Sequence, residues 1–487
     1  MEGMQKRKKQ SRVAGRRAMT GLIAMVAGAV AMERTTAQSA DALIEKLVEK
    51  GILSSKEAVE LRKETDSDFG KALRNRQDLP DWVTVFKLTG SFAGRFEHFH
   101  ADNPLYTERT RYRYRARLGA VVTLKEDFEV GIQMSSGEFD PRYGGGSPVS
   151  GQSTLASGAS RKPVFFELAY GKWTAINNDI ATASMTIGKM RNPFQPSSSV
   201  ADEPTMLFDP DIFPEGLAAS VSYHIDPKHT LNFDGGYYVL GEVDQTLPVD
   251  NILSPGHDPA FYGGQLTWNA KWSKKLSTAL GVSAFSLTGR ENLRVFTPPA
   301  PDLLAVPNVN AGNTRSGLGG LAYDMTPLMV SPQVVYTLSS FPLYPGEFPV
   351  RLYGDYAENP SAPRDNVGYR LGIRLGKASK KGTWDVGYRY QSLGADVWYE
   401  ELVDDNNGAF YQQADPLSGF FIPSDGTGGR GYRGGTNVRG HLVRVNYAIT
   451  DGLMFSFNYY LNSLIHPSPA GSVSGAGHFF TDLEWKF

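Results

Sequence analysis

The feature that most constrains this chain is a two-residue period that begins at Val85 and recurs in long segments to the end of the sequence. In the first segment the apolar or small residues are Phe86, Leu88, Gly90, Phe92, Gly94 and Phe96, and the residues between them are Lys87, Thr89, Ser91, Ala93, Arg95 and Glu97. Successive side chains of a β-strand point to opposite faces, so this segment predicts a strand with one apolar face and one charged face. Several such segments reach about ten residues, the length that crosses a bilayer when the strand is tilted.

The second segment strengthens this interpretation. Tyr112, Tyr114, Ala116 and Leu118 alternate with Arg111, Arg113, Arg115 and Arg117. A strand inside a soluble core could not bury a row of arginines on one face without partners for each of them. A strand that faces a water-filled lumen could carry such a row.

Counting the segments predicts sixteen strands. After the strands that begin near 85, 111 and 128, we expect strands near 163–173, 181–190, 217–225, 230–240, 261–272, 276–287, 328–338, 348–357, 367–377, 383–392, 438–449, 453–462 and 476–487. Short connections alternate with long ones, as in barrels whose turns face the periplasm and whose loops face outside. An extra strand at 317–323 would break this alternation, so we assign that segment to a loop. The even count supports an all-β, 16-stranded antiparallel transmembrane β-barrel.

The alternative all-β folds fit less well. Strands of a soluble sandwich or propeller average about five or six residues, which is shorter than these segments. No blade-sized repeat is evident. The last strand alternates to its end, with Phe479, Thr481, Leu483, Trp485 and Phe487 on one face. A terminal aromatic strand of this kind is typical of outer-membrane proteins.

The first 80 residues differ from the rest. Basic residues precede an apolar stretch from Ala18 to Met32, and small residues follow, so we expect a signal peptide over residues 1–37, with an uncleaved anchor as the alternative. Residues 38–80 predict a periplasmic helical segment, with helices at 40–50 and 55–65. A partly disordered spacer is the alternative there. The barrel would occupy residues 81–487.

Composition excludes several classes of protein. After residue 32 no apolar run is long enough for a transmembrane helix. The chain has no cysteine, which excludes thiol chemistry and disulfides. Removing residues 1–37 takes away eight basic and two acidic residues and leaves 42 basic and 49 acidic ones, so we expect no nucleic-acid partner.

Short motifs add a family resemblance. The segment Leu43 to Arg62, LIEKLVEKGILSSKEAVELR, resembles the opening of the putative porin family of bacterial outer membranes. Three further stretches are similar to that family: IGKMRNPF from Ile187, FDPDIFPEG from Phe208, and VRLYGDY from Val350 followed by Asn359. The family resembles phosphate-selective porins in layout. The resemblance therefore implies a 16-stranded barrel of the Gram-negative outer membrane and a homotrimer, but it names no solute.

Two features could select the solute. The loop 191–216 is rich in proline and acidic residues, so we expect it to fold inward and narrow the pore, with a loop lying on the rim as the alternative. We also predict a pore lining that gives a mild anion preference. Its residues are Arg95, Arg111, Arg113, Arg115, Arg117, Lys189, Arg191, Arg351, Arg370, Arg374 and Arg389. The alternative is that these charges pair with acidic neighbours and only fill the wall.

We expect no enzyme, no cofactor and no metal site. The histidines are scattered, and neither a GxSxG nor an HxxxH arrangement occurs. His98 and His100 could touch a metal, but solvated histidines at a strand end are the simpler interpretation. The leading hypothesis is a porin for passive diffusion of small polar solutes, in contact with outer-membrane lipid and lipopolysaccharide. The alternatives are a channel specific for phosphate or another anion, and a structural or adhesive barrel with a closed lumen.

Overall fold

The computed structural model describes residues 80, 82–102, 108–140, 145–156, 158–194, 205–242, 258–295, 307–308, 312–316, 320–408, 435–467 and 473–487. The signal peptide and the helical segment expected over residues 1–80 fall almost wholly outside this part of the chain. Among the described residues, no helix has the length and apolar character needed to cross a membrane.

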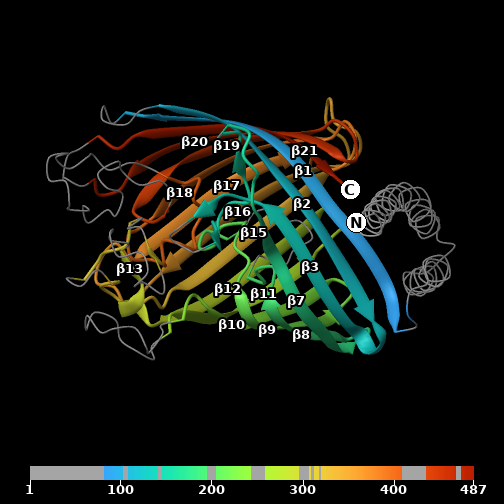
Figure 1. Ribbon diagram of the computed structural model, residues 1–487. Helices are drawn as coiled ribbons and strands as arrows, with labels where there is room; N and C mark the ends of the chain where they lie inside the picture. Colours follow the sequence, from blue (N-terminus) through green and yellow to red (C-terminus); the bar gives the residue numbers. More distant parts are fainter. Residues whose placement is uncertain are drawn as a thin grey trace, which may run out of the picture. The chain divides into compact units, whose positions relative to one another are not determined.

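Sixteen long strands form the barrel (Figure 1). They are β1 (Val83–Ala101), β2 (Arg109–Leu124), β3 (Phe128–Ser136), β7 (Val164–Asn177), β8 (Ala181–Lys189), β9 (Glu215–Asp226), β10 (His229–Val239), β11 (Ala260–Lys271), β12 (Leu276–Thr288), β15 (Leu328–Leu338), β16 (Phe348–Glu358), β17 (Val367–Gly376), β18 (Trp384–Leu393), β19 (Val438–Ala448), β20 (Leu453–Leu464) and β21 (Ala476–Lys486). Short elements lie in the connections: β4 (Phe139–Asp140), β5 (Gly145–Gly146), β6 (Ser153–Thr154), β13 (Arg294–Val295), β14 (Pro307–Asn308), and the 3-10 turns η1 (Lys125–Asp127) and η2 (Arg290–Asn292). Of these, the two-residue strand β6 adds to the same sheet as the long strands by pairing with β2.

The contacts divide the chain into two units, of which the smaller comprises residues 1–88, 120–126 and 487. Its described part holds the first residues of β1, the last residues of β2 and the turn that follows. There the Thr84 hydroxyl donates to the carbonyl oxygen of Thr123 at 2.9 Å, and the backbone N–H of Lys125 donates to the carbonyl of Trp82 at 3.1 Å.

The larger unit, residues 89–119 and 127–486, is a closed antiparallel barrel. Each long strand pairs with the next one in the chain, and the ring closes where β1 pairs with β21, from Ser91 opposite Lys486 to Ala101 opposite Ala476. Closure leaves no unpaired strand edge, which is the condition for a sheet to span lipid. The expected count of sixteen strands is therefore confirmed.

Burial follows the alternation seen in the sequence. Outward side chains such as Ile187 and Leu371 are 65% and 68% exposed, whereas inward side chains such as Gln265 and Asp385 are 1% and 0% exposed. A barrel that spans a lipid bilayer requires an apolar outer surface, and its inner surface can be polar. Of the segment 317–323, the structure describes residues 320–323, and these belong to no barrel strand; Leu321 forms an isolated bridge with Arg315.

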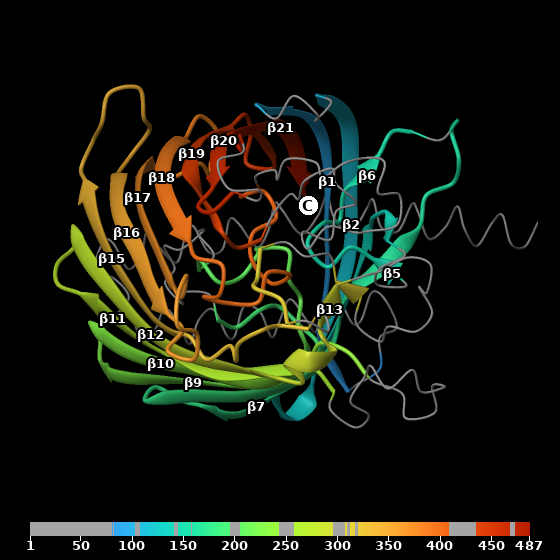
Figure 2. The same ribbon diagram turned by 90° about the vertical axis from the view of Figure 1, so that its left-hand side faces the viewer.

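The apolar core lies inside the ring of strands. Figure 2, a view from one end of the barrel, shows chain segments that follow β12 and β18 folded into the ring. Their side chains pack with those of the loop after β8 and with inward residues of β10, β11 and β12. The cluster includes Phe194, Phe208, Tyr238, Phe261, Phe285, Leu293, Met325 and Trp398.

Candidate functional site

The arginine row of β2 faces the lumen. Arg111 and Arg113 are 8% and 7% exposed, and their neighbour Tyr112 is 59% exposed on the outer face. Arg115 and Arg117 are half-buried and lie further along the same strand. Because residues two apart on a strand share a face, the four guanidinium groups form one inward row, as expected from the sequence.

Glu97 on β1 is the partner of the two buried arginines. Its carboxylate lies 2.9 Å from the guanidinium of Arg111 and 3.4 Å from that of Arg113. Nε2 of His478, on β21, lies 3.0 Å from Oε1 of Glu97. Glu97 is only 1% exposed, so these contacts compensate for the cost of burying its charge.

Acidic residues also neutralise the half-buried arginines. Arg115 lies 3.3 Å from Glu484 and 3.6 Å from Asp211. Arg117 donates from Nε to Glu167 at 2.9 Å and lies 3.0 Å from Asp211. Asp211 belongs to the loop after β8, so one loop carboxylate faces both arginines.

Arg95 completes this side of the lumen. Its guanidinium donates to both carboxylate oxygens of Asp482, at 2.7 and 2.9 Å. The same group lies 4.0 Å from the ring centre of Phe480, at cation–π distance. Because β1 and β21 are the strands that close the barrel, this ion pair crosses the closing seam.

Ion pairs also organise the opposite wall. Arg370 on β17 lies 2.5 Å from Asp355 on β16, and Arg389 on β18 lies 2.8 Å from Asp404. Arg374 donates to both oxygens of Asp385, at 3.0 and 2.9 Å. Arg351 stands opposite Arg374 in the β16–β17 register. The alternative that lumen charges pair with each other thus describes most of the predicted lining.

The structure does not place Lys189 beside the arginine row, so its role in the pore lining stays a prediction. Lys189 shares the outward register of β8 with the exposed residues Met185 and Ile187, and its Nζ lies 2.7 Å from Glu215. Strand alternation therefore directs Lys189 away from the arginine row. Arg191, two residues past the strand end, is exposed.

The loop after β8 crosses the lumen. The backbone N–H of Met206 donates to Asp355 of β16 at 3.2 Å, whereas Asp211 contacts Arg117 of β2. In the ring, β2 is separated from β16 by several strands in either direction. Residues 205–214 therefore reach from one wall to the other, and the alternative of a loop on the rim does not describe them. Asp202 and Glu203, also expected in this loop, lie outside the described residues.

An aromatic cluster holds this loop. The ring centres of Phe194 and Phe285 are 4.9 Å apart, and those of Phe208 and Phe285 are 5.2 Å apart. Trp398, from the segment after β18, lies 6.1 Å from Phe208 and is fully buried. The cluster fills the part of the lumen next to β10, β11 and β12, and the charged side chains of β21, β1 and β2 lie outside it.

Three buried polar residues fix the segment after β18. The side-chain amide of Asn313 donates to the carbonyl oxygens of Ala395 and Trp398, at 2.6 and 2.8 Å. Asn359 donates to the carbonyl of Asp396 at 2.7 Å, and Arg315 pairs with Glu400. Of these residues, the sequence analysis noted only Asn359, through its family motif. No sequence pattern near Asn313 or Glu400 indicates their role, because their hydrogen-bond partners lie more than eighty residues away in the chain.

One group of carboxylates among the described residues has the spacing of a cation site. Oxygens of Asp209, Asp404 and Asp405 lie within 4.8 Å of one another. Asp209 already accepts backbone N–H groups from Asp211 at 2.6 Å and Asp405 at 3.2 Å. A cation would compete with these contacts and with Arg389 on Asp404.

Burial and neighbouring charges shift the pKa values of two aspartates in the loop after β8. Burial, together with the carboxylates of Asp405, Asp404 and Asp211, raises the pKa of Asp209 well above its ordinary value. For Asp211, burial also raises the pKa, but the guanidinium groups of Arg115 and Arg117 outweigh it, so the net shift is downward. The pKa values of these two aspartates, which are neighbours in one loop, are therefore shifted in opposite directions.

This geometry defines a transmembrane β-barrel channel of the Gram-negative outer membrane. It combines a closed 16-stranded ring, an apolar outer face and a charged lumen that an inward loop crosses. Residues 100–298 match the model of the family described as Putative porin, and the resemblance noted in the sequence is confirmed over that stretch.

Comparison with solved structures gives further likenesses. Pseudomonas putida OprB at high pH is 14% identical with a TM-score of 0.49, over 82% of this chain and 94% of that one. A triple mutant of the Rhodopseudomonas blastica porin is 9% identical with a TM-score of 0.37, over 83% of this chain and all of that one. The comparison with curated proteins gave no match.

Proposed function

We propose that this barrel is a porin through which small polar solutes diffuse passively, with a mild preference for anions. The observation that carries the proposal is the charged side of the lumen on β21, β1 and β2. There Arg95, Arg115 and Arg117 keep 14–17% of their side-chain surface exposed, although each pairs with a carboxylate. Charged groups that retain contact with water are suited to a hydrated path.

Pairing explains why the preference should be mild. Basic residues outnumber acidic ones at the inward strand positions of the described barrel. Asp209, Asp211 and Asp404 from the inward loops offset part of that excess. A paired charge has a weaker electric field than an isolated one. Ion selectivity should therefore depend on the small net positive charge that pairing leaves.

The test is a planar-bilayer measurement on the folded protein. We expect an ohmic conductance and a reversal potential in a KCl gradient that favours chloride by less than about tenfold, corresponding to under about 1.4 kcal/mol. Cation selectivity would overturn the proposed preference. Inorganic phosphate is added as a competitor, and a saturable block at low concentration would favour the phosphate-specific alternative over free diffusion.

The aromatic cluster inside the ring keeps a second candidate open, a structural or adhesive barrel with a closed lumen. Phe208, Phe285 and Trp398 fill one side of the interior with apolar side chains, which do not conduct ions. Absence of conductance from protein shown to be folded by its heat-dependent gel shift would favour this candidate. Export by residues 1–37, assembly as a homotrimer, and contact with lipopolysaccharide belong to the proposal as well.

A further inference from the structure

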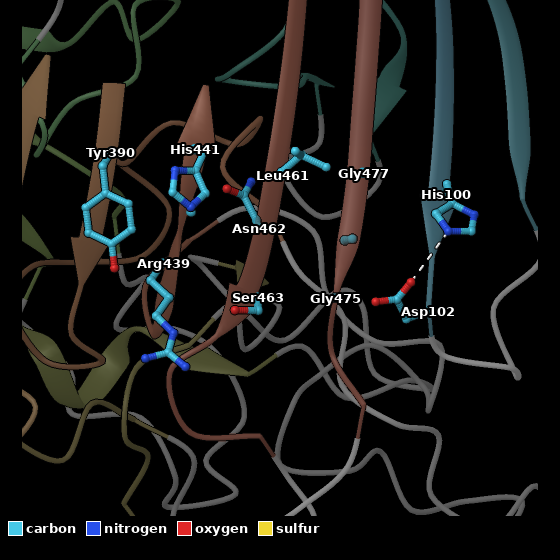
Figure 3. Close-up of a pocket in the computed structure, with 12 residues that line it drawn as sticks. His100, Asp102, Tyr390, Arg439, His441, Leu461, Asn462, Ser463, Gly475 and Gly477 are labelled. Carbon is cyan, nitrogen blue, oxygen red and sulfur yellow. Dashed lines mark ion pairs between the residues drawn. The ribbon is translucent and has the colours of Figure 1, made fainter. Parts of the chain in front are cut away.

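A hollow of about 390 Å³ is lined by residues of β18, β19, β20, β21 and β1 and by Asp102 and Gly475 beside two of these strands (Figure 3). Five of the lining residues stand in one row across the five strands, where each is the backbone partner of the next. The row runs Tyr390 of β18, His441 of β19, Leu461 of β20, Gly477 of β21 and His100 of β1.

Burial shows that this row faces outward. Leu461 is 44% exposed, whereas its chain neighbour Asn462, which has the opposite register and also borders the hollow, is 6% exposed. Likewise His441 is exposed, and Leu442, which follows it, is 5% exposed on the inner face. Long connections join these strand ends, so the hollow belongs to the outer-leaflet side of a barrel of this type.

Glycine creates the hollow. Gly477 occupies the row between Leu461 and His100, where any other residue would fill the space with a side chain. At Gly475, two positions along the same face, a Cβ atom would collide with the carboxylate of Asp102. The outer surface therefore has a gap where the adjacent strands present large side chains.

Groups suited to an anion stand at one end of the hollow. Arg439 is exposed, lines the gap and makes no ion pair with any residue in the described ranges. The Nδ1 atom of His441 lies 2.9 Å from the hydroxyl of Tyr388, which fixes the orientation of its ring. A guanidinium group presents several N–H donors in the geometry that phosphate oxygens accept.

Hydrogen-bond acceptors and donors stand at the other end. His100 lies 3.5 Å from Asp102 and 2.7 Å from Glu108. Such carboxylates can accept hydrogen bonds from hydroxyl groups. At the opposite end, beside His441, the ring of Tyr390 offers an apolar face. A ligand that matches both ends carries a phosphate and several hydroxyls.

Apolar side chains continue from the hollow along the outer face of the same strands. Val443 is 38% exposed, and Phe479 contacts Tyr459 with ring centres 6.4 Å apart. A free sugar phosphate has no apolar part that could contact these side chains, whereas the acyl chains of a lipid could pack against them. We propose that the hollow binds the phosphorylated sugar headgroup of an outer-leaflet lipid, with Arg439 on the phosphate. This inference rests on the outer-membrane placement of the proposed function.

The test uses the full-length mature protein in detergent and purified lipid A, an acylated glucosamine disaccharide that carries two phosphates. Binding is measured by native mass spectrometry. We expect Arg439→Gln to weaken binding by about tenfold, because contacts to a charged group are lost. Gly477→Leu, which fills the hollow, should also weaken it. Arg109→Gln, an exposed arginine on the lumen-facing register of β2, is the matched control and should bind like the wild type.

Several outcomes would overturn the proposal. Equal affinity of the wild type and Arg439→Gln would do so, as would equal affinity for lipid A stripped of its phosphates. Competition by free inorganic phosphate at similar concentration would show an anion site that does not need the lipid. A change in oligomeric state without a change in lipid binding would assign the hollow to a protein interface. Wild-type conductance, recorded on the same preparation, tests the proposed function separately.

Discussion

The carboxylate of Asp211 lies 3.0 Å from the guanidinium of Arg117, although 94 residues separate them in the chain. One residue belongs to the loop after β8 and the other to the wall of the lumen on β2. The contact anchors the loop and also removes positive charge from the path that solutes would follow. If solutes pass this wall, as proposed, we expect loop position and ion selectivity to be coupled through the side chain of Asp211.

Asp211→Asn should increase the anion preference. The substitution keeps the shape of the side chain but leaves Arg115 and Arg117 with less negative charge nearby. We expect the chloride-to-potassium permeability ratio to rise about twofold, equivalent to roughly 0.4 kcal/mol. The measurement is the reversal potential in a salt gradient. Asp226→Asn, in an exposed turn away from the row, should leave the ratio unchanged, and an equal shift there would contradict the argument.

Phe208→Ala should loosen the inward loop and enlarge the channel. Phe208 is fully buried and contacts Phe194, Phe285 and Trp398, so its removal leaves a cavity that costs about 3–5 kcal/mol. We expect single-channel conductance to increase and fluctuate more. Phe233→Ala removes an outward ring that is 46% exposed, and its conductance should match the wild type.

Glu97→Gln should destabilise the barrel at its closing seam. Arg111 and Arg113 would lose their shared negative partner while remaining buried, and breaking a buried ion pair costs about 3–5 kcal/mol. The measurement is the free energy of unfolding in urea in the presence of detergent micelles. Glu358→Gln, on an exposed side chain of β16, serves as the control. Equal stability of the two variants would mean that Glu97 is dispensable.

The contact between the inward loops should weaken as pH rises. The pKa of Asp209 is higher in the folded loops than in an unfolded chain, so the folded loops bind more protons. The contribution of Asp209 to their stability is then fully present below the ordinary carboxyl pKa, and it is lost as pH rises through the raised pKa. The lowered pKa of Asp211 acts in the opposite direction, but only below the ordinary carboxyl pKa. Hydrogen exchange of the peptides that contain Asp209 and Asp405, corrected for the intrinsic rate, should become faster as pH rises through the raised pKa of Asp209.

Asp405→Asn is the matched variant for this pH dependence. It removes a negative neighbour of Asp209, so the pKa of Asp209 should fall and the pH dependence of exchange should become shallower. Peptides of β19, which contributes no residue to the apolar cluster of the inward loops, should show no such change in either protein. Identical pH profiles for the variant and the wild type would contradict the role given to the carboxylate cluster.

The strands could be predicted because alternation is local. Each strand shows its two faces within about ten residues, and the parity of turns and loops fixes how many strands there are. The same rule bears on Lys189, because Met185, Ile187 and Lys189 have the same parity along β8. The prediction instead followed the position of Lys189 beside a loop, which does not determine the face on which a strand residue lies.

The contents of the lumen could not be predicted in the same way. Whether Arg117 is unpaired or neutralised depends on Asp211, and the position of Asp211 depends on a loop without periodicity. The support of Trp398 by Asn313 joins segments 85 residues apart. Such contacts depend on tertiary packing rather than on any local pattern. The sequence therefore indicated the charges and offered their pairing as an alternative, but it could not show which carboxylate pairs with which arginine.

The pairing of β1 with β21 also constrains how the molecule can be made. The first strand of the ring cannot complete its hydrogen bonds until the last strand has left the ribosome and crossed the inner membrane. A partial ring would expose backbone N–H and C=O groups to lipid, where nothing can accept or donate to them. Assembly must therefore wait for the whole chain, and the unfinished protein needs protection from aggregation on the way.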